Sequence, residues 1–310
     1  MSSEISVVVC AHDEARWGEL GENIKSLRLQ TLAPYEVIVV VDHNPDLLRR
    51  ARSELDATVV PNTQIRGLGG ARNSGVAAAS GSIVAFLDDD AYAVPQWLDR
   101  LAEPYRDPDV AGVGGSAEPV WAHARPAWFP REFDWVVGCS YLGMPETSQA
   151  VRNLFGCNMS YRRELLSELG GFRLGYGCDE TELCIRLGRR WPDKKLLYVP
   201  EAKVFHHVPD ARTGFRRFLS RCYFEGGSKA VVARLVGRSH ALSTEYQYAR
   251  HVLPVGVRRG IGDFVLRGDT SGLARAAALL AGLASATAGY AATSVSFDRA
   301  AALRGWSGQA

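Results

Sequence analysis

The sequence predicts an α/β fold, with a doubly wound, mostly parallel central sheet and a helical C-terminal extension. Short apolar runs alternate with helix-like patterns through the first part of the chain, which is typical of strands joined by helical crossovers. Beyond residue 210 the composition changes to basic and Ala-rich stretches with helical periodicity. With 310 residues and 46% hydrophobic content, the chain is long enough to bury a large core.

Apolar runs and turn residues define the elements of the predicted sheet. The runs at 5–10 and 83–87 are continuous, as in strands that are buried on both faces of a parallel sheet. Leu20, Ile24 and Leu27 recur at the spacing of one helix face. The expected strands are 5–10, 37–41, 57–60 and 83–87, and the expected helices are 19–29, a segment opened by Pro45, and 74–79.

The central strand, 83–87, ends abruptly in the acidic triplet Asp88, Asp89 and Asp90. Three carboxylates at one point repel one another and are costly beside a buried strand end, unless a cation or several backbone donors lie among them. Mg²⁺ or Mn²⁺ is commonly held by one or two carboxylates together with phosphate oxygens. The triplet therefore indicates either a nucleotide-diphosphate site or an acidic turn that caps the helix following Pro95.

Polar residues also follow the first two strands, at the sheet edge where a ligand lies in such folds. Ala11 to Asp13 end the first strand, and Asp42 ends the second. Asp42 can accept hydrogen bonds from a base or a ribose, and Arg72 can offer a cationic fork to oxygens. Taken singly, Asp42 is a turn residue and Arg72 a surface charge, but their combination with the triplet favours a ligand site.

The charge distribution separates the C-terminal part from the rest. The net charge is +2, yet residues 212–267 hold eleven basic and three acidic side chains, a net charge of +8. Such a block can face anionic lipid, a phosphate-bearing substrate or solvent. Nucleic acid is disfavoured because no recognised binding motif is present. The six cysteines form no Cys-x-x-Cys pair and no export leader is evident, so a cytoplasmic protein is expected.

Two further segments leave alternatives open. The stretch 117–153 is rich in tryptophan, tyrosine and phenylalanine, which can stack on a sugar or a polyprenyl acceptor, or form a satellite core under a loop. The uncharged segment 276–297 is long enough to cross a bilayer but consists mostly of small residues. It is expected as a helix that packs on the protein or lies at a membrane surface.

The motifs in this order resemble the family 2 glycosyltransferases of GT-A fold, over roughly the first two-thirds of the chain. Any one of these short motifs is weak, whereas the ordered set is specific. The motifs are Ala11-His12-Asp13-Glu14, Val-Val-Asp42, Gly-Gly-Ala-Arg72-Asn73, Phe-Leu-Asp88-Asp89-Asp90, Gly156-Cys157-Asn158-Met159-Ser160, Gly170-Gly171-Phe172, Asp179-Glu180-Thr181-Glu182-Leu183 and Ala202-Lys203-Val204-Phe205-His206-His207.

The resemblance implies a metal-dependent enzyme that moves a sugar from a nucleotide-diphospho-sugar, with a UDP-sugar as the expected donor, to an acceptor hydroxyl with inversion. It implies a Mn²⁺ or Mg²⁺ site at Asp90, Asp88 and His206, with the adjacent His207 as the alternative; His206 is preferred because it continues the alternation of Val204. The residues implied for the nucleotide sugar are Ala11, Asp13, Asp42, Arg72, Asp88, Asp89 and Asn158.

The resemblance also implies a general base at the start of the helix 179–190. The family usually has Glu-Asp there, whereas this chain reads Cys178-Asp179 at the expected place. Asp179 is therefore assigned as the base and Glu182, one turn further on, as its competitor. For either acid, the alternative is a helix cap, because carboxylates stabilise a helix N-terminus.

The expected organisation is a GT-A domain at 1–210 and a helical extension at 211–310. Within the domain, 1–115 would bind the nucleotide sugar and 116–210 the acceptor. The partners considered are a sugar, lipid-linked or small-molecule acceptor, an anionic membrane surface and a second copy of the chain. The rival functions are a non-catalytic or weakly hydrolytic nucleotide-sugar binder, left open by Cys178, and a sugar nucleotidyltransferase, disfavoured by the acidic Asp13 and Glu14.

Overall fold

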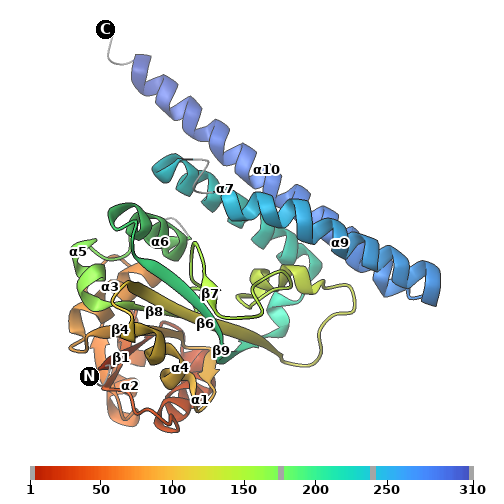
Figure 1. The fold of residues 1–310 in the computed structure, drawn as a ribbon. Coiled ribbons are helices and arrows are strands. Elements are labelled where there is room, and N and C mark those ends of the chain that lie inside the picture. The colour runs from red at the N-terminus through yellow and green to blue at the C-terminus, as the bar shows by residue number, and fades with distance from the viewer. Residues whose placement is uncertain (1–3, 174–177, 238–241, 307–310) are drawn as a thin grey trace.

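The computed structural model describes residues 4–173, 178–237 and 242–306. One curled sheet carries helices on both faces, and three long C-terminal helices lie beside it (Figure 1). The strands are β1 (Ile5–Ala11), β2 (Glu36–Val41), β3 (Thr58–Pro61), β4 (Ile83–Asp88), β5 (Ala91–Ala93), β6 (Val110–Trp121), β7 (Gln149–Ala150), β8 (Asn158–Arg162) and β9 (Lys195–Val208).

The helices interleave with these strands along the chain. The α-helices are α1 (Trp17–Arg28), α2 (Pro45–Glu54), α3 (Leu68–Ala78), α4 (Trp97–Ala102), α5 (Arg163–Glu168), α6 (Asp179–Arg190), α7 (Phe215–Val236), α9 (Ser243–Arg267) and α10 (Thr270–Trp306). Short 3-10 helices are η1 (Glu14–Arg16), η2 (Glu103–Arg106), η3 (Arg131–Val137) and η4 (Asp210–Arg212).

The sheet runs in the order β3-β2-β1-β4-β8-β6-β9-β5, with β7 paired to β9. The first four strands of this order are parallel, as predicted. The second half is mixed, because β8 runs antiparallel to both β4 and β6 while β9 runs parallel to β6. The predicted α/β fold with C-terminal helices is thus confirmed, with its parallel region confined mainly to the N-terminal half.

Two cores cover the two faces of the sheet. Val7 and Val9 of β1 pack with Leu20 of α1 on one face, whereas Val8 packs with Ala71 of α3 on the other. This alternation explains why the first strand reads as continuously apolar. The helix predicted at 74–79 in fact begins at Leu68, so the Gly-rich stretch belongs to α3 and places Arg72 within it.

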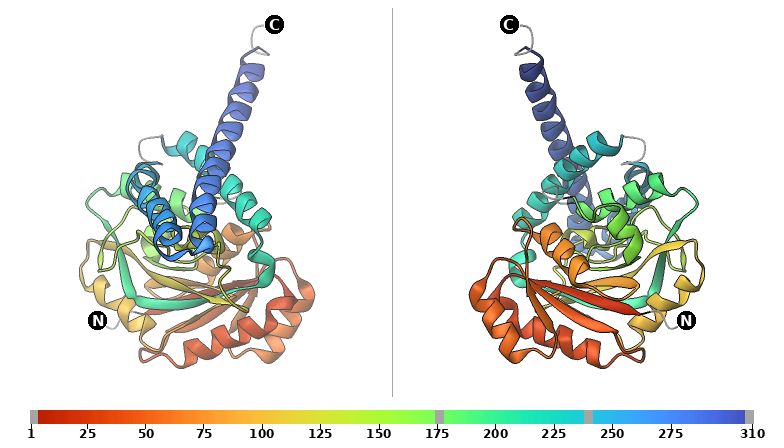
Figure 2. Two further views of the ribbon diagram at one scale, coloured as in Figure 1. Left: turned by 90° about the vertical axis from the view of Figure 1, so that its right-hand side faces the viewer. Right: turned by 90° about the vertical axis from the view of Figure 1, so that its left-hand side faces the viewer.

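A third core joins the aromatic segment to the C-terminal helices. Phe133 of η3 lies 5.3 Å, between ring centroids, from Phe218 of α7. Leu253 of α9 and Leu279 of α10 complete the cluster. The segment 117–153 therefore supplies a satellite core, which was one of its two interpretations. The predicted boundary at 210 falls within η4, just before α7, and the third core packs α7, α9 and α10 against the body that precedes them (Figure 2).

The helix α10 packs against α7 over part of its length and then projects away from the body (Figure 2). Among the described residues, its segment Thr270–Ser296 is the one helix long and apolar enough to cross a membrane, with a mean hydropathy of 1.3 and 28% of that window buried. The close approach of α7 and α10 depends on glycine. A Cβ at Gly226 would lie 1.9 Å from the Ala286 carbonyl oxygen, and one at Gly289 would lie 1.9 Å from that of Tyr223.

Gly226→Ala should therefore loosen the contact between α7 and α10. The added methyl group meets backbone rather than a movable side chain, and overpacking of this kind costs about 1 to 3 kcal/mol. Gly262→Ala in α9 is the matched control, because a Cβ there has open space. Replacing a glycine within a helix by alanine should raise the free energy of unfolding by about 0.5 to 1 kcal/mol. Urea denaturation followed by circular dichroism measures both, and equal midpoints for the two variants would contradict the packing argument.

Candidate active site

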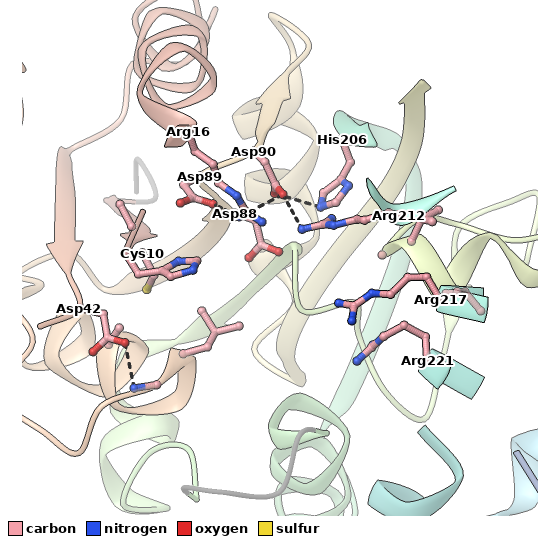
Figure 3. A pocket seen from close by; sticks show the side chains of 18 residues that line it. Cys10, Arg16, Asp42, Asp88, Asp89, Asp90, His206, Arg212, Arg217 and Arg221 are labelled. Carbon is pink, nitrogen blue, oxygen red and sulfur yellow. Dashed lines mark hydrogen bonds and ion pairs between the residues drawn. The ribbon is translucent and has the colours of Figure 1, made fainter. Parts of the chain in front are cut away.

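A cavity of about 480 Å³ lies at the carboxyl ends of β1, β2 and β4, where the acidic triplet was expected to meet a ligand (Figure 3). The far wall comes from His206 of β9 and from the segment that follows it. The lining residues are Cys10, Ala11, His12, Arg16, Asp42, Gly67, Leu68, Ala71, Asp88, Asp89, Asp90, Val136, Val137, Gly138, His206, Arg212, Arg217 and Arg221.

The buried Asp90 is the centre of the charged cluster in this cavity. His206 Nε2 lies 3.1 Å from Asp90 Oδ1, while Arg16 Nη1 and Arg212 Nη2 lie 3.2 and 3.1 Å from Asp90 Oδ2. Burial opposes ionisation of Asp90, but these three neighbours hold its pKa well below the usual range. Asp89 differs, because burial raises its pKa to about 7 despite its 2.8 Å ion pair with Arg16.

The residues Asp88, Asp90 and His206 are suited to a divalent metal. Each offers one ligand atom, and the three atoms lie within 4.8 Å of one another. Among the described residues, the buried His206 Nδ1 has no hydrogen-bond partner. Unsatisfied buried polar atoms are costly, and carboxylate with imidazole is a ligand set that Mn²⁺ accepts. Arg16 and Arg212 supply the positive charge that balances the acids in this cluster.

The alternative ligand His207 points away from the cluster. Its Nε2 lies 3.0 Å from Glu22 Oε2, and its ring packs at 5.5 Å from that of Tyr92. Successive side chains of a strand face opposite sides, so only one of two adjacent histidines on β9 can reach Asp90. The preference for His206 agrees with this geometry, whereas His207 is not positioned as a ligand.

Of the residues expected at the nucleoside, Ala11 and Asp42 line the cavity. Asp42 accepts hydrogen bonds from Asn62 Nδ2 at 2.6 Å and from the Gly67 backbone N–H at 2.9 Å. Burial alone would raise the pKa of Asp42, but these hydrogen bonds and the neighbouring His43 lower it. Asp42 therefore stays ionised and orders the loop that leads into α3.

Two expected ligand residues have structural contacts instead. Asp13 is exposed, lines neither described cavity and caps η1 by accepting from the Ala15 backbone N–H at 3.0 Å. Asn158 is fully buried, accepts from Trp97 Nε1 and donates to the carbonyl oxygens of Ser116 and Ala202, each at 2.8 Å. Asn158 therefore ties β8 to β6 and β9, and it lines neither described cavity.

A second cavity of about 380 Å³ adjoins the first at Asp88, Leu68, Gly138 and Arg221, which line both. Arg72 lines the second cavity beside Asp88: its Nη2 donates to the Gly156 carbonyl oxygen at 2.9 Å and lies 3.7 Å from Asp88 Oδ1. The remaining wall combines aromatic, charged and aliphatic side chains. They include Phe133, Trp135, Tyr141, Arg152, Phe155, Glu180, Glu225, Lys229, Glu245, Tyr248, Leu253 and Leu283.

The acid of α6 that lines this second cavity is Glu180, which is not among the predicted site residues. Burial raises the pKa of Glu180, against the lowering effect of the Arg72 guanidinium. Asp179 lines neither cavity. The fully buried Glu182 is held by Arg186 and Arg173 at 2.9 and 3.1 Å, so it is an ion-pair residue rather than a free base. The signal for Glu180 was present, because Asp179 and Glu180 are themselves an adjacent acidic pair.

Comparisons with known proteins agree with this architecture. The model of glycosyl transferase family 2 matches residues 6–170. The glucosyl-dolichyl phosphate glucuronosyltransferase of Haloferax volcanii is 33% identical over 242 residues, which are 74% of this chain and 77% of that protein.

Two solved structures share the fold. The mannosyltransferase PcManGT of Pyrobaculum calidifontis, in complex with GDP-Man and Mn²⁺, matches with a TM-score of 0.55 and 19% identity, over 91% of this chain and 86% of that one. GalNAc-T7 with UDP, GalNAc and Mn²⁺ matches with a TM-score of 0.54 and 18% identity, over 79% of this chain and 53% of that one. These likenesses confirm the GT-A fold expected from the sequence.

His206→Gln should weaken Mn²⁺ binding by at least about tenfold, because it removes one of three convergent ligand atoms. His207→Gln is the matched control and should leave the affinity unchanged, since that ring faces Glu22. Electron paramagnetic resonance of free Mn²⁺ during titration measures both variants. If the two substitutions weaken binding equally, or only the second does, the ligand assignment on β9 is wrong.

Proposed function

The chain belongs to glycosyltransferase family 2, and on that basis we propose that it transfers a sugar from a nucleotide-diphospho-sugar to an acceptor hydroxyl with inversion. The observation that carries the proposal is the meeting of two unlike cavities at Asp88. The first has an acidic floor suited to a metal and a diphosphate, and the second is lined by the half-buried Glu180 together with aromatic side chains. The donor would lie in the first cavity with its sugar directed past Asp88 into the second.

The donor side would use residues at three strand ends. Ala11 and Asp42, at the carboxyl ends of β1 and β2, line the first cavity, where a base and ribose would fit. A divalent ion held by Asp90, Asp88 and His206 would neutralise the charge that develops on the departing diphosphate. Mn²⁺ or Mg²⁺ can serve, and the imidazole favours Mn²⁺. UDP-sugars are the first donors to test and GDP-sugars the second, since one similar structure holds UDP and another holds GDP-Man.

The acceptor side would use Glu180 as the general base in place of Asp179. Its carboxylate would accept the proton of the acceptor hydroxyl as that oxygen attacks the anomeric carbon from the face opposite the diphosphate. A raised pKa makes the ionised carboxylate of Glu180 a stronger base. Arg72 beside it would hold the sugar and diphosphate in line for a single displacement, without a covalent intermediate.

Glu180→Gln should retain donor binding but lose transfer by about two decades or more, the range expected for loss of general-base assistance. Asp179→Asn and Glu182→Gln are the matched comparisons. In the wild type, kcat should fall as the pH drops through the raised pKa of Glu180, because protonation removes the base. That acidic limb should be absent in Glu180→Gln. If instead Asp179→Asn abolishes transfer and Glu180→Gln does not, the original assignment of Asp179 is right.

We also propose that the protein works in the cytoplasm at an anionic membrane surface. The last turn of α9, next to the α9–α10 connection at the end remote from the sheet, exposes 70% of Val265 and 84% of Leu266 (Figure 1). Ile261, Phe264 and Leu273 are also exposed there. Residues 258–275 contain four arginines and two aspartates, so an apolar tip carries a positive border. That combination suits insertion into the headgroup region of anionic lipid.

This location would bring a lipid-linked acceptor to the second cavity. Leu253 of α9 and Leu283 of α10 line that cavity, so its wall is continuous with the two helices that carry the apolar tip. The similar Haloferax protein is named for a substrate linked to dolichyl phosphate, which supports a lipid-linked acceptor here. A soluble sugar or small-molecule acceptor is the alternative if no lipid is bound.

Leu266→Asp should abolish most cosedimentation with anionic vesicles, because it places a charge at the most exposed apolar position of the tip. Leu29→Asp is the matched control. Leu29 is likewise an exposed leucine, at 62%, but it caps the C-terminus of α1 on the α/β body, outside the apolar tip. Wild-type binding should weaken at high salt and with neutral vesicles. Equal binding of all three proteins, or none to any vesicle, would contradict the membrane proposal.

A further inference from the structure

The helix α7 contributes two arginines to the first cavity from outside the region that the family model matches. Arg217 and Arg221 are four residues apart and therefore lie on one face of α7. Both line the cavity, and their guanidinium groups point into it across from Asp88 and Asp90 (Figure 3). Arg221 also lines the second cavity, so it lies at the junction of the two.

These two arginines differ from Arg16 and Arg212 in having no anionic partner among the described residues. Arg16 and Arg212 are paired with Asp89 and Asp90. Within the part of the chain that the structure describes, neither Arg217 nor Arg221 makes an ion pair or a side-chain hydrogen bond. The cavity therefore has an acidic floor with paired charges and an opposite wall whose positive charge is uncompensated.

We infer that Arg217 and Arg221 form a phosphoryl-binding subsite at the junction of the two cavities. The planar guanidinium fork matches two oxygens of a phosphate, and two forks one helical turn apart can hold one phosphate or diphosphate group. The group comes from the diphosphate of the donor or from a phosphate of the acceptor, since Arg221 reaches both cavities. This inference rests on the proposed function and extends it, because it makes α7 part of the substrate site.

Arg217 and Arg221 would also offset the repulsion between the carboxylates of the first cavity and a bound diphosphate. Three carboxylates on its floor would repel a diphosphate, and the charges of Arg16 and Arg212 are already committed to those carboxylates. A phosphoryl group that reaches the opposite wall gains attraction there without displacing an existing ion pair. Because Arg217 is exposed and Arg221 is half-buried, this attraction should be partly screened by salt.

The test uses the 310-residue chain and its double variant Arg217→Ala/Arg221→Ala, with Arg216→Ala as the matched control. Arg216 is exposed on the same helix but does not line either cavity. Isothermal titration with Mn²⁺ present measures pyrophosphate, UDP, GDP and citronellyl phosphate, and compares them with uridine, guanosine and citronellol. Circular dichroism confirms that the double variant is folded.

We expect the double variant to bind pyrophosphate at least about tenfold more weakly, with Arg216→Ala and the phosphate-free probes unchanged and with a smaller difference at high salt. A matching loss for UDP or GDP identifies the donor diphosphate as the source, whereas a loss confined to citronellyl phosphate identifies the acceptor. If the wild type binds pyrophosphate through these arginines but binds no nucleotide, the subsite stands and the proposed function fails. Equal pyrophosphate affinity in all three proteins, or none in the wild type, overturns the inference.

Discussion

The constraint on which the structure depends is the placement of three carboxylates at the end of a buried strand. Asp89 and Asp90 are almost fully buried, so their charge must be balanced from nearby. The balance comes from Arg16 in η1 and Arg212 in η4, while His206 of β9 lies 3.1 Å from Asp90, and these residues are far apart in the sequence. The acidic triplet thus draws the first loop, the central strand and the end of the sheet together, and it defines the floor of the first cavity.

The C-terminal helices extend this arrangement rather than standing apart from it. The helix α7 packs through Phe218 on the aromatic segment and, from the same helix, presents Arg221 to both cavities. The helices α9 and α10 close the second cavity with Leu253 and Leu283. A division at residue 210 follows the change in composition, yet the substrate site as proposed draws on both sides of it.

Much of the fold and part of the site could be predicted from the sequence because they depend on local pattern. Continuous apolar strands identified the parallel half of the sheet, and strand alternation distinguished His206 from its neighbour. The antiparallel direction of β8 was not predictable, since a short apolar run carries no sign of direction. The contacts of Asn158 were not predictable, because an asparagine that joins buried strands by hydrogen bonds cannot be told from one that binds a ligand by its residue type alone. That Glu180 lines the second cavity was not predictable, because the rotation of α6 decides which acid of the helix is directed toward it.

The most direct measurement is the melting temperature of the wild type with a panel of nucleotide sugars, in Mn²⁺ and in EDTA. A ligand that binds only the folded state at about 100 times its Kd adds about 2.7 kcal/mol, which is several degrees for a domain of this size. If the acidic triplet and His206 form a metal-diphosphate site, at least one nucleotide sugar should raise the melting temperature in Mn²⁺ and lose that effect in EDTA. A panel that gives no shift, or the same shift with EDTA, would contradict the account.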